Sequence, residues 1–515
     1  MANTANALAC LAAMAAGYLA AVSEARAQEP PVTFHEPHRP QFHYTPQRNW
    51  MNDPNGLVFL DGEYHLFHQY NPLGDTWGHM SWAHAVSRDL MHWEHLPVAL
   101  AEENGVMIFS GSAVVDHRNT SGFGRDGKPP LVAIYTGHTP AEQTQHIAYS
   151  TDKGRTWTKF AGNPVINENL KDFRDPKVIW HEPGKQWVMV VSLSDQRRMR
   201  FYGSKDLKSW QTLGEFGGEG SIEGIWECPD LFELPVAKTD GSDSGRKRWV
   251  LVVNIGGGTP AGGSGVQYFV GDFDGKTFKN DNAKDVKLWA DYGPDFYAAQ
   301  SFSDMPAADG RRVWMGWMSN WRYAHVEPTK PWRTAQSLPR ELMLVETPGG
   351  IRLAQKPVRE LEKLRAEMLS PPQFADAGQQ MELHVTFPSN ATATVRVHDD
   401  GEHATLIGHD ARRREMFVDR TKSRPGAPFH KGFPARYTAP IAPDNDGKIR
   451  LQVMVDRSSV EVFGNGGLSV ITATTFAPDG ARGLTVNDAT DTEGKPAPVA
   501  VRVWRLKSIW GDEKN

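Results

Sequence analysis

The sequence predicts an all-β protein in which a five-bladed β-propeller, residues 35–350, is followed by a C-terminal β-sandwich, residues 372–512. Three observations lead to this prediction. The chain has 515 residues, more than a single core usually contains, so two domains are expected. Its 48 Gly and 35 Pro indicate many short strands joined by turns. A strand–turn–aromatic pattern recurs along the first domain, and strands of alternating polarity follow it.

The recurring pattern defines the blades. Its aromatic residues are Trp93, Trp157, Trp210 and Phe278, at steps of 64, 53 and 68 residues. Steps of this length have room for a four-stranded sheet with its loops, which is typical of propeller blades. With the aromatic strand at residues 313–318 as a further repeat, we expect five blades. Because the repeats are imperfect, six blades is the alternative count.

Three acidic stretches, each with its acid just before a proline, fall near the starts of predicted blades. Asp53 lies in the stretch 50–56, Asp175 precedes Pro176, and Glu227 comes two residues before Pro229. An isolated Asn-Asp-Pro-Asn-Gly is also ideal for a plain turn, so the prediction depends on the recurrence. The first strand of a blade usually lines the central channel, so we expect the three carboxylates to meet at one mouth of it. Stretches 110–112 and 299–301 occupy the equivalent places in the second and fifth blades.

The second half of the chain changes in pattern. Val358, Leu361, Leu364 and Met368 recur at helical spacing, which predicts a short amphipathic linker helix over residues 356–371. Beyond it, residues 381–387 and 451–455 alternate with period two, as expected for a β-sandwich. The sandwich has no clustered acidic motif, so we expect a structural or auxiliary role for it.

The N-terminal segment predicts export. Residues 1–27 are an Ala-rich apolar run that resembles a signal peptide with cleavage after Ala27, although its first seven residues lack Lys and Arg. We therefore expect a secreted or periplasmic protein. Cleavage would leave Cys228 as the one cysteine, which excludes an intrachain disulfide.

Composition also bounds the partners. A net charge of −5 gives no basic footprint for nucleic acid, and no further stretch has the ~20 apolar residues of a membrane span. No complete set of metal ligands is recognisable, so neither a metal nor another cofactor is expected. The sequence does not determine an oligomeric state.

The acids suit the hydrolysis of a glycosidic bond, which needs a proton donor and an anion or water at the anomeric carbon. Glu227 is flanked by Ile225 and Trp226, and apolar neighbours favour a carboxyl that keeps its proton. Asp53 lies among Asn side chains and turn amides, which favour the ionised form of a nucleophile. A third acid can bind sugar hydroxyls.

Six motifs, in order and spacing, resemble glycoside hydrolase family 32, the β-fructofuranosidases, and the resemblance covers nearly the whole mature chain. Two further stretches, residues 297–302 and 315–321, are more similar to the exo-acting fructanases, the levanases and exo-inulinases, than to the invertases. The six motifs are residues 50–56, 69–72, 77–78, 109–112, 174–176 and 226–229.

The resemblance implies a retaining double displacement that releases terminal fructose from levan, inulin or fructo-oligosaccharides, with sucrose as a further candidate. It implies Asp53 as nucleophile, Glu227 as general acid/base and Asp175 as a transition-state stabiliser. Departures at His68 and Ala83 leave the preferred linkage, β-2,1 or β-2,6, open. The substrate-binding residues that it implies are Asn52, Gln69, Trp77, Phe109, Ser110, Arg174 and Trp317.

Several other functions stay open on the sequence. An invertase or a fructosyltransferase of the same family would carry the same motifs. An inverting glycosidase on a related propeller would hold its acid and base ~6.5–9.5 Å apart, whereas a retaining pair stands ~5–5.5 Å apart. A non-catalytic carbohydrate-binding propeller is the alternative outside enzymes.

Overall fold

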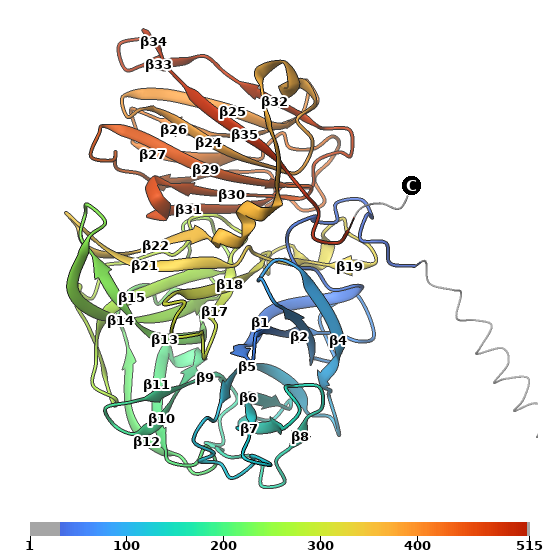
Figure 1. The fold of residues 1–515 in the computed structure, drawn as a ribbon, viewed down its shortest axis with the longest axis vertical. Helices are drawn as coiled ribbons and strands as arrows, with labels where there is room; N and C mark the ends of the chain where they lie inside the picture. Colours follow the sequence, from blue (N-terminus) through green and yellow to red (C-terminus); the bar gives the residue numbers. More distant parts are fainter. Residues whose placement is uncertain (1–30, 512–515) are drawn as a thin grey trace, which may run out of the picture.

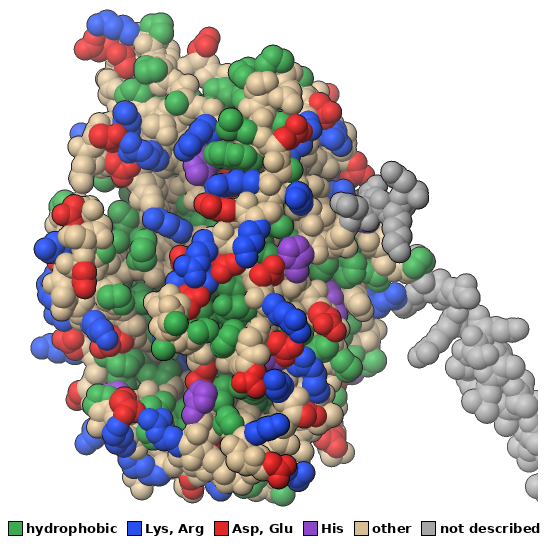
Figure 2. Space-filling model, in the orientation of Figure 1, with side chains coloured by type: hydrophobic (Ala, Val, Ile, Leu, Met, Phe, Trp, Pro, Cys, Tyr) green, Lys and Arg blue, Asp and Glu red, His purple; other side chains and the backbone are tan. Residues whose placement is uncertain are grey.

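The computed structural model describes residues 31–511 and contains two β domains that pack against each other (Figure 1). The predicted signal peptide, residues 1–27, lies outside the described residues. Within residues 31–511, no helix is long and apolar enough to span a membrane. On the face drawn in Figure 2, acidic and basic side chains are interspersed over both domains. The described helices are short 3₁₀ turns: η1 (Ser194–Gln196), η2 (Ala324–Val326), η3 (Arg359–Leu364), η4 (Pro371–Asp376) and η5 (Asn465–Gly467).

The first domain is a five-bladed propeller, as predicted. Each of its first four blades contains four consecutive antiparallel strands, and the fifth is assembled from the strands that follow. The fourth and fifth blades are joined into one sheet. The blades comprise β1 (Asn49–Leu60), β2 (Glu63–Tyr70), β3 (Ser81–Ser87) and β4 (Trp93–Leu100); β5 (Met107–Val115), β6 (Leu131–His138), β7 (Gln143–Ser150) and β8 (Thr158–Lys159); β9 (Phe173–His181), β10 (Gln186–Leu193), β11 (Arg198–Ser204) and β12 (Gln211–Gly217); β13 (Trp226–Ala237), β14 (Asp243–Ile255), β15 (Gly265–Phe273) and β16 (Phe278–Asn280); β17 (Tyr297–Ser301), β18 (Arg312–Met318), β21 (Arg340–Thr347) and β22 (Gly350–Pro357).

The first strand of each blade lies at the centre, where β1, β5, β9, β13 and β17 contact one another in a closed ring (Figure 1). A short additional strand, β19 (Trp332–Arg333), pairs in parallel with β1. The short strand β20 (Ala335–Gln336) pairs with β18, and the end of β13 pairs in parallel with β21 of the fifth blade. This ring confirms the prediction that the first strands line the channel.

A Ser-x-Asp sequence recurs in three blades and forms the same hydrogen-bonded turn in each. The serines Ser87, Ser150 and Ser204 end the third strands, and each hydroxyl donates to the Asp two residues later, at 3.2, 2.7 and 3.1 Å. Each of these Asp side chains also accepts backbone N–H bonds from the turn that leads to the fourth strand. The sequence repeat is therefore a set of side-chain-capped turns between the outer two strands of a blade.

The segment that connects the two domains, residues 356–371, differs from the prediction. No amphipathic α-helix forms over residues 356–371; η3 and the strand β23 (Arg365–Leu369) stand there, so the linker-helix prediction is wrong. Val358, Leu361 and Leu364 are buried, but Met368 is 62% exposed. The i, i+3 spacing of the first three fits a 3₁₀ turn, and residues 365–369 complete the edge of a sandwich sheet by pairing with β35 (Ala500–Leu506).

The second domain is a sandwich of two antiparallel sheets around an apolar core. One sheet has the order β23-β35-β24-β29-β30-β31, and the other has β28-β27-β26-β25-β33-β34 with β32 beside β25. The remaining strands are β24 (Met381–Pro388), β25 (Ala391–Asp399), β26 (Thr405–Asp410), β27 (Glu415–Asp419), β28 (Arg436–Pro440), β29 (Lys448–Asp456), β30 (Ser459–Gly464), β31 (Ser469–Thr474), β32 (Gly483–Val486), β33 (Ala489–Asp491) and β34 (Pro496–Ala497).

The interface between the two domains is apolar and ionic at once. One hydrophobic cluster contains Met51 and Leu66 of the propeller together with Met454 and Phe463 of the sandwich. Beside it, His43 bridges two sandwich carboxylates, Asp456 at 2.7 Å and Glu461 at 2.8 Å. Burial opposes the charge of this ring, but the two carboxylates outweigh burial and raise the pKa of His43 to about 9. The domains are thus joined by a continuous core and by buried charge pairs.

Candidate active site

All five inner strands carry a β-bulge at the same level of the channel. In each, two residues oppose one on the neighbouring strand, which bends the strand and re-aims its side chains. The paired residues are Asn52-Asp53 in β1, Phe109-Ser110 in β5, Asp175-Pro176 in β9, Cys228-Pro229 in β13 and Ala298-Ala299 in β17.

The bulges explain the prolines that follow Asp175 and Glu227, because Pro176 and Pro229 are themselves bulge residues. Proline has no N–H to leave unpaired, so it is tolerated at a bulge within a sheet. Asp175 and Cys228 take left-handed backbone conformations, φ +67° and +43°, that are unfavourable for residues other than glycine. The stretch around Asp53 also forms a bulged strand, and not the plain turn that its sequence would allow.

Asp53 and Asp175 meet at Cys228. The Cys228 Sγ lies 3.4 Å from Asp53 Oδ2 and 3.5 Å from Asp175 Oδ2, and the Cys228 backbone N–H donates to Asp175 at 2.9 Å. Glu227 immediately precedes Cys228 on β13. The three predicted acids, from the first, third and fourth blades, therefore come together at one end of the inner strands.

Glu227 is held by two donors. Arg174 Nε donates to its Oε1 at 3.1 Å, and the Tyr297 hydroxyl donates to its Oε2. Arg174 is itself fixed by Asp172 at 2.9 Å and by Gln143 at 3.1 Å. The Glu227 side chain is 19% exposed, more than the other two acids, so it is the carboxyl that water reaches best.

Burial sets the electrostatics of the two aspartates. It raises the pKa of Asp53, opposed by hydrogen bonds from Ser110 at 2.6 Å and Asn52 at 3.1 Å. It also raises the pKa of Asp175, where Arg174 opposes the shift and the neighbouring carboxylates add to it. The prediction that the surroundings of Asp53 favour its ionised form is wrong, because burial outweighs the hydrogen bonds and raises the pKa.

Several predicted binding residues contact the acids or their supports. Asn52 and Ser110 donate to Asp53. Gln69 donates to Asn55 at 3.0 Å and to the Ile108 carbonyl at 3.0 Å, so it braces the first two blades behind the acids.

The predicted aromatic residues divide into two kinds. Trp77 is 39% exposed and meets Phe109 edge-on, with ring centroids 6.0 Å apart, so both can face a ligand at the mouth. Trp317 has no exposed surface, and its indole N–H donates to Thr334 at 2.9 Å. Its ring supports the wall from behind and offers no open face for stacking, which narrows its predicted part to shaping the site.

Two residues of the site were not singled out by sequence reasoning. Both lie inside sequence motifs: Cys228 and Tyr297. Their contacts, the thiol with Asp53 and Asp175 and the phenol with Glu227, form only in the folded propeller, where different blades become neighbours. The signal available was position, since each lies within two residues of a bulge that lines the channel.

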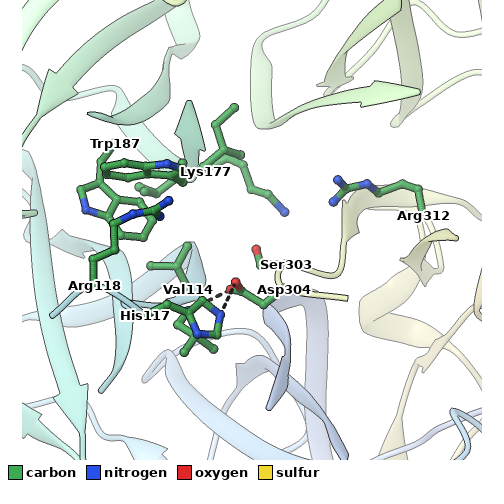
Figure 3. Close-up of a pocket in the computed structure, with 12 residues that line it drawn as sticks. Val114, His117, Arg118, Lys177, Trp187, Ser303, Asp304 and Arg312 are labelled. Atoms are coloured by element: carbon green, nitrogen blue, oxygen red, sulfur yellow. Dashed lines mark hydrogen bonds and ion pairs between the residues drawn. The ribbon is translucent and has the colours of Figure 1, made fainter. Parts of the chain in front are cut away.

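The opposite end of the same strands holds a different set of side chains (Figure 3). A cavity of about 280 Å³ there is lined by residues that include Lys177, Arg312, Asp304 and Trp187. Lys177 lies two residues beyond Asp175 on β9, so the cavity and the acids are at different levels of the channel. Among residues 31–511, no cluster of three or more His, Cys, Asp or Glu is arranged to hold a metal ion.

Two family models match the chain. The glycosyl hydrolases family 32 N-terminal domain matches residues 43–357, and the glycosyl hydrolases family 32 C-terminal domain matches residues 352–505. The two matches coincide with the propeller and the sandwich.

Curated proteins and solved structures are similar over most of the chain. A levanase of Bacillus subtilis is 50% identical, covering 93% of this chain and 72% of its own, and an extracellular exo-inulinase of Aspergillus ficuum is 39% identical, covering 93% and 96%. The crystal structure of an exo-inulinase from Aspergillus awamori superposes with a TM-score of 0.86 at 36% identity, over 93% of this chain and 100% of that one. A β-fructofuranosidase from Schwanniomyces occidentalis, complexed with fructosyl-erythritol, superposes with a TM-score of 0.82 at 33% identity, over the same shares.

Proposed function

The chain belongs to glycosyl hydrolase family 32, and on this premise we propose that it is an exo-acting β-fructosidase that releases terminal fructose from fructans. The observation that carries the proposal is the meeting of Asp53, Asp175 and Glu227 at one mouth of the channel. The similarity to a levanase and to exo-inulinases supports levan or inulin as substrate, with sucrose as a further candidate.

The proposed reaction proceeds in two steps with retention. In the first, an Asp53 oxygen attacks the anomeric carbon of the terminal fructosyl unit while Glu227 gives its proton to the departing glycosidic oxygen. In the second, water attacks the fructosyl–Asp53 ester, and Glu227 takes the proton from that water. The ester bond breaks, and fructose leaves with both carboxyl groups restored.

The surroundings of each acid support these roles. Glu227 must exchange protons with water in every cycle, and it is the most exposed of the three. Asp53 attacks carbon directly, and Ser110 and Asn52 hold its two oxygens in place. Asp175, together with Arg174, would bind hydroxyl groups of the sugar. We assign Asn52, Gln69, Trp77, Phe109, Ser110 and Arg174 to the fructose subsite and Trp317 to the wall behind it.

We further propose that the protein acts outside the cytoplasm. The matched exo-inulinases are extracellular, and residues 1–27 have the composition of a signal peptide. N-terminal sequencing of the exported protein would test this, and a first residue at Gln28 is the expected result.

Time-resolved analysis of products from levan, inulin and sucrose tests the proposed activity. Free fructose from the first time point onward is expected. A ladder of oligosaccharides would contradict exo attack, and longer oligosaccharides accumulating at high sucrose would indicate a fructosyltransferase. No product from any substrate would favour a carbohydrate-binding protein.

A further inference from the structure

An arginine of the sandwich, Arg420, binds side chains of the propeller behind the acids. Arg420 follows β27 and is buried. Each of its five N–H groups has an acceptor, which is the full donor capacity of an arginine. The acceptors are the Phe433 carbonyl at 2.7 Å, Asp295 Oδ2 at 2.7 Å, the Thr474 carbonyl at 2.8 Å, the Tyr323 hydroxyl at 2.8 Å and the Tyr437 hydroxyl at 2.9 Å.

The two propeller acceptors, Asp295 and Tyr323, are themselves joined, because the Tyr323 hydroxyl donates to Asp295 Oδ1. Asp295 also accepts the backbone N–H of Thr474, at 2.8 Å, from the sandwich. The carboxylate, the phenol and the guanidinium thus form one buried network across the domain interface, with every group satisfied.

From Asp295 the network leads to Glu227. Asp295 lies two residues before Tyr297, at the start of the inner strand β17. The Tyr297 hydroxyl is one of the two donors that hold Glu227. A displacement of Asp295 would therefore move the phenol that orients the Glu227 carboxyl.

From Tyr323 the network leads to Asp53. Tyr323 caps η2, and the neighbouring His325 stacks on Trp50 with ring centroids 4.8 Å apart. The Trp50 indole N–H donates to Asn52 at 2.7 Å, and Asn52 donates to Asp53 at 3.1 Å.

The two segments are tied together between the arginine and the acids. Asn320, three residues before Tyr323, donates to the Pro294 carbonyl at 2.7 Å. The segment that supports Glu227 and the segment that supports Asp53 are thus both held by Arg420.

We propose that Arg420 is a positioning residue, through which the sandwich domain holds Asp53 and Glu227 in register for the reaction. The inference rests on the catalytic roles proposed above for those two acids. It gives the sandwich a part in turnover that its lack of acidic motifs did not suggest.

The fifth blade offers a matched control. Arg311, just before β18, is nearly buried and also has an acceptor for each of its five N–H groups, Glu341 among them at 2.7 Å. Its other acceptors are Asp309 and Glu360. None of these three residues forms a described hydrogen bond with residues 295–297, with Tyr323 or with the three acids.

The experiment compares Arg420→Lys, Tyr323→Phe and Arg311→Lys in the full chain. It measures kcat, KM and the pH dependence of kcat for fructose release from inulin and levan, below the Tm of each variant. Lysine keeps the charge of Arg420 but satisfies fewer acceptors. We expect Arg420→Lys to lower kcat by about tenfold with KM little changed and to alter the pH profile, because misplaced catalytic groups lose transition-state interactions. Tyr323→Phe should do the same to a smaller extent.

Arg311→Lys should lower Tm while leaving kcat and the pH profile as in the wild type. The inference is overturned if Arg420→Lys and Tyr323→Phe keep the wild-type kcat and pH profile, or if Arg311→Lys changes them equally. Should Arg420→Lys not fold, Tyr323→Phe decides. A wild type that releases no fructose would contradict the proposed function instead, and Asp53→Asn, which should be inactive, separates the two failures.

Discussion

The two ends of the five inner strands differ in how they treat charge. At one end, bulges bring Asp53, Asp175 and Glu227 together, and burial raises the pKa of the first two. At the other end, past the bulges, Lys177 and Asp230 form a buried pair at 3.3 Å. The same strands thus bring like charges together at the end where chemistry is proposed. At the other end they pair opposite charges, which stabilise the ring.

The cost of the acidic end is visible in the backbone as well. Left-handed conformations at Asp175 and Cys228 cost on the order of 1–3 kcal/mol each. The cavity at the opposite end also contains a left-handed residue, Asp304 at φ +56°. The buried charges there are paired and hydrogen-bonded, since Lys177 also donates to the Ser301 carbonyl at 2.7 Å and Asp230 accepts the Leu231 N–H at 2.8 Å. Function and stability are therefore separated along a strand by only a few residues.

The largest expected effect is at the acidic end. Asp53→Asn and Glu227→Gln should each lower turnover by ~10³-fold or more, because each removes a group that acts on the breaking bond. Steady-state fructose release measures the loss, and an unchanged circular dichroism spectrum shows that the fold is kept. Substantial activity in Asp53→Asn would remove it as nucleophile.

The next largest effect is expected from removing the buried charge pair at the opposite end. Lys177→Met should lower Tm by several degrees, because an unpaired buried Asp230 costs ~3–5 kcal/mol. Turnover of the folded variant should stay within about threefold of the wild type. The double variant Lys177→Met with Asp230→Asn should recover part of the lost Tm. A double variant less stable than Lys177→Met alone would contradict this account of the pair.

A smaller effect of opposite sign is expected at Asp175. Its folded-state pKa is raised, so the protonated carboxyl is favourable below the unfolded value near 4, and that stability is lost as pH rises through the folded value. Asp175→Asn never ionises, so it should be more stable than the wild type at pH 8, by a few degrees in Tm, and nearly equal at pH 4. Calorimetry at both values measures this. The exposed Asp61→Asn is the control, and a lower Tm for Asp175→Asn at pH 8 would refute the prediction.

The smallest effect should come from chelation. Treatment with EDTA is expected to leave fructose release within measurement error, since no metal-ligand cluster is found among residues 31–511. A large loss that is reversed by added Ca²⁺ or Zn²⁺ would show that a metal supports one end of the channel.

The sequence by itself determined the repeat, and with it much of the site. The Ser-x-Asp turns and the steps between Trp93, Trp157 and Trp210 are local patterns, and local patterns survive in any fold that keeps four-stranded blades. The acids before Pro176 and Pro229 were readable for the same reason, because a bulge that tolerates proline leaves its mark in the sequence.

Only the tertiary structure decided what lies between distant segments. Cys228 lies between two carboxylates, and Trp317 is fully buried behind the site. Both follow from the closure of the propeller, which sets which strands become neighbours. The connector became a 3₁₀ turn and an edge strand, since β35 offered hydrogen-bonding partners that a helix would have left unused. The reach of Arg420 into the propeller follows from domain packing, and no spacing along the chain encodes a contact made across 125 residues.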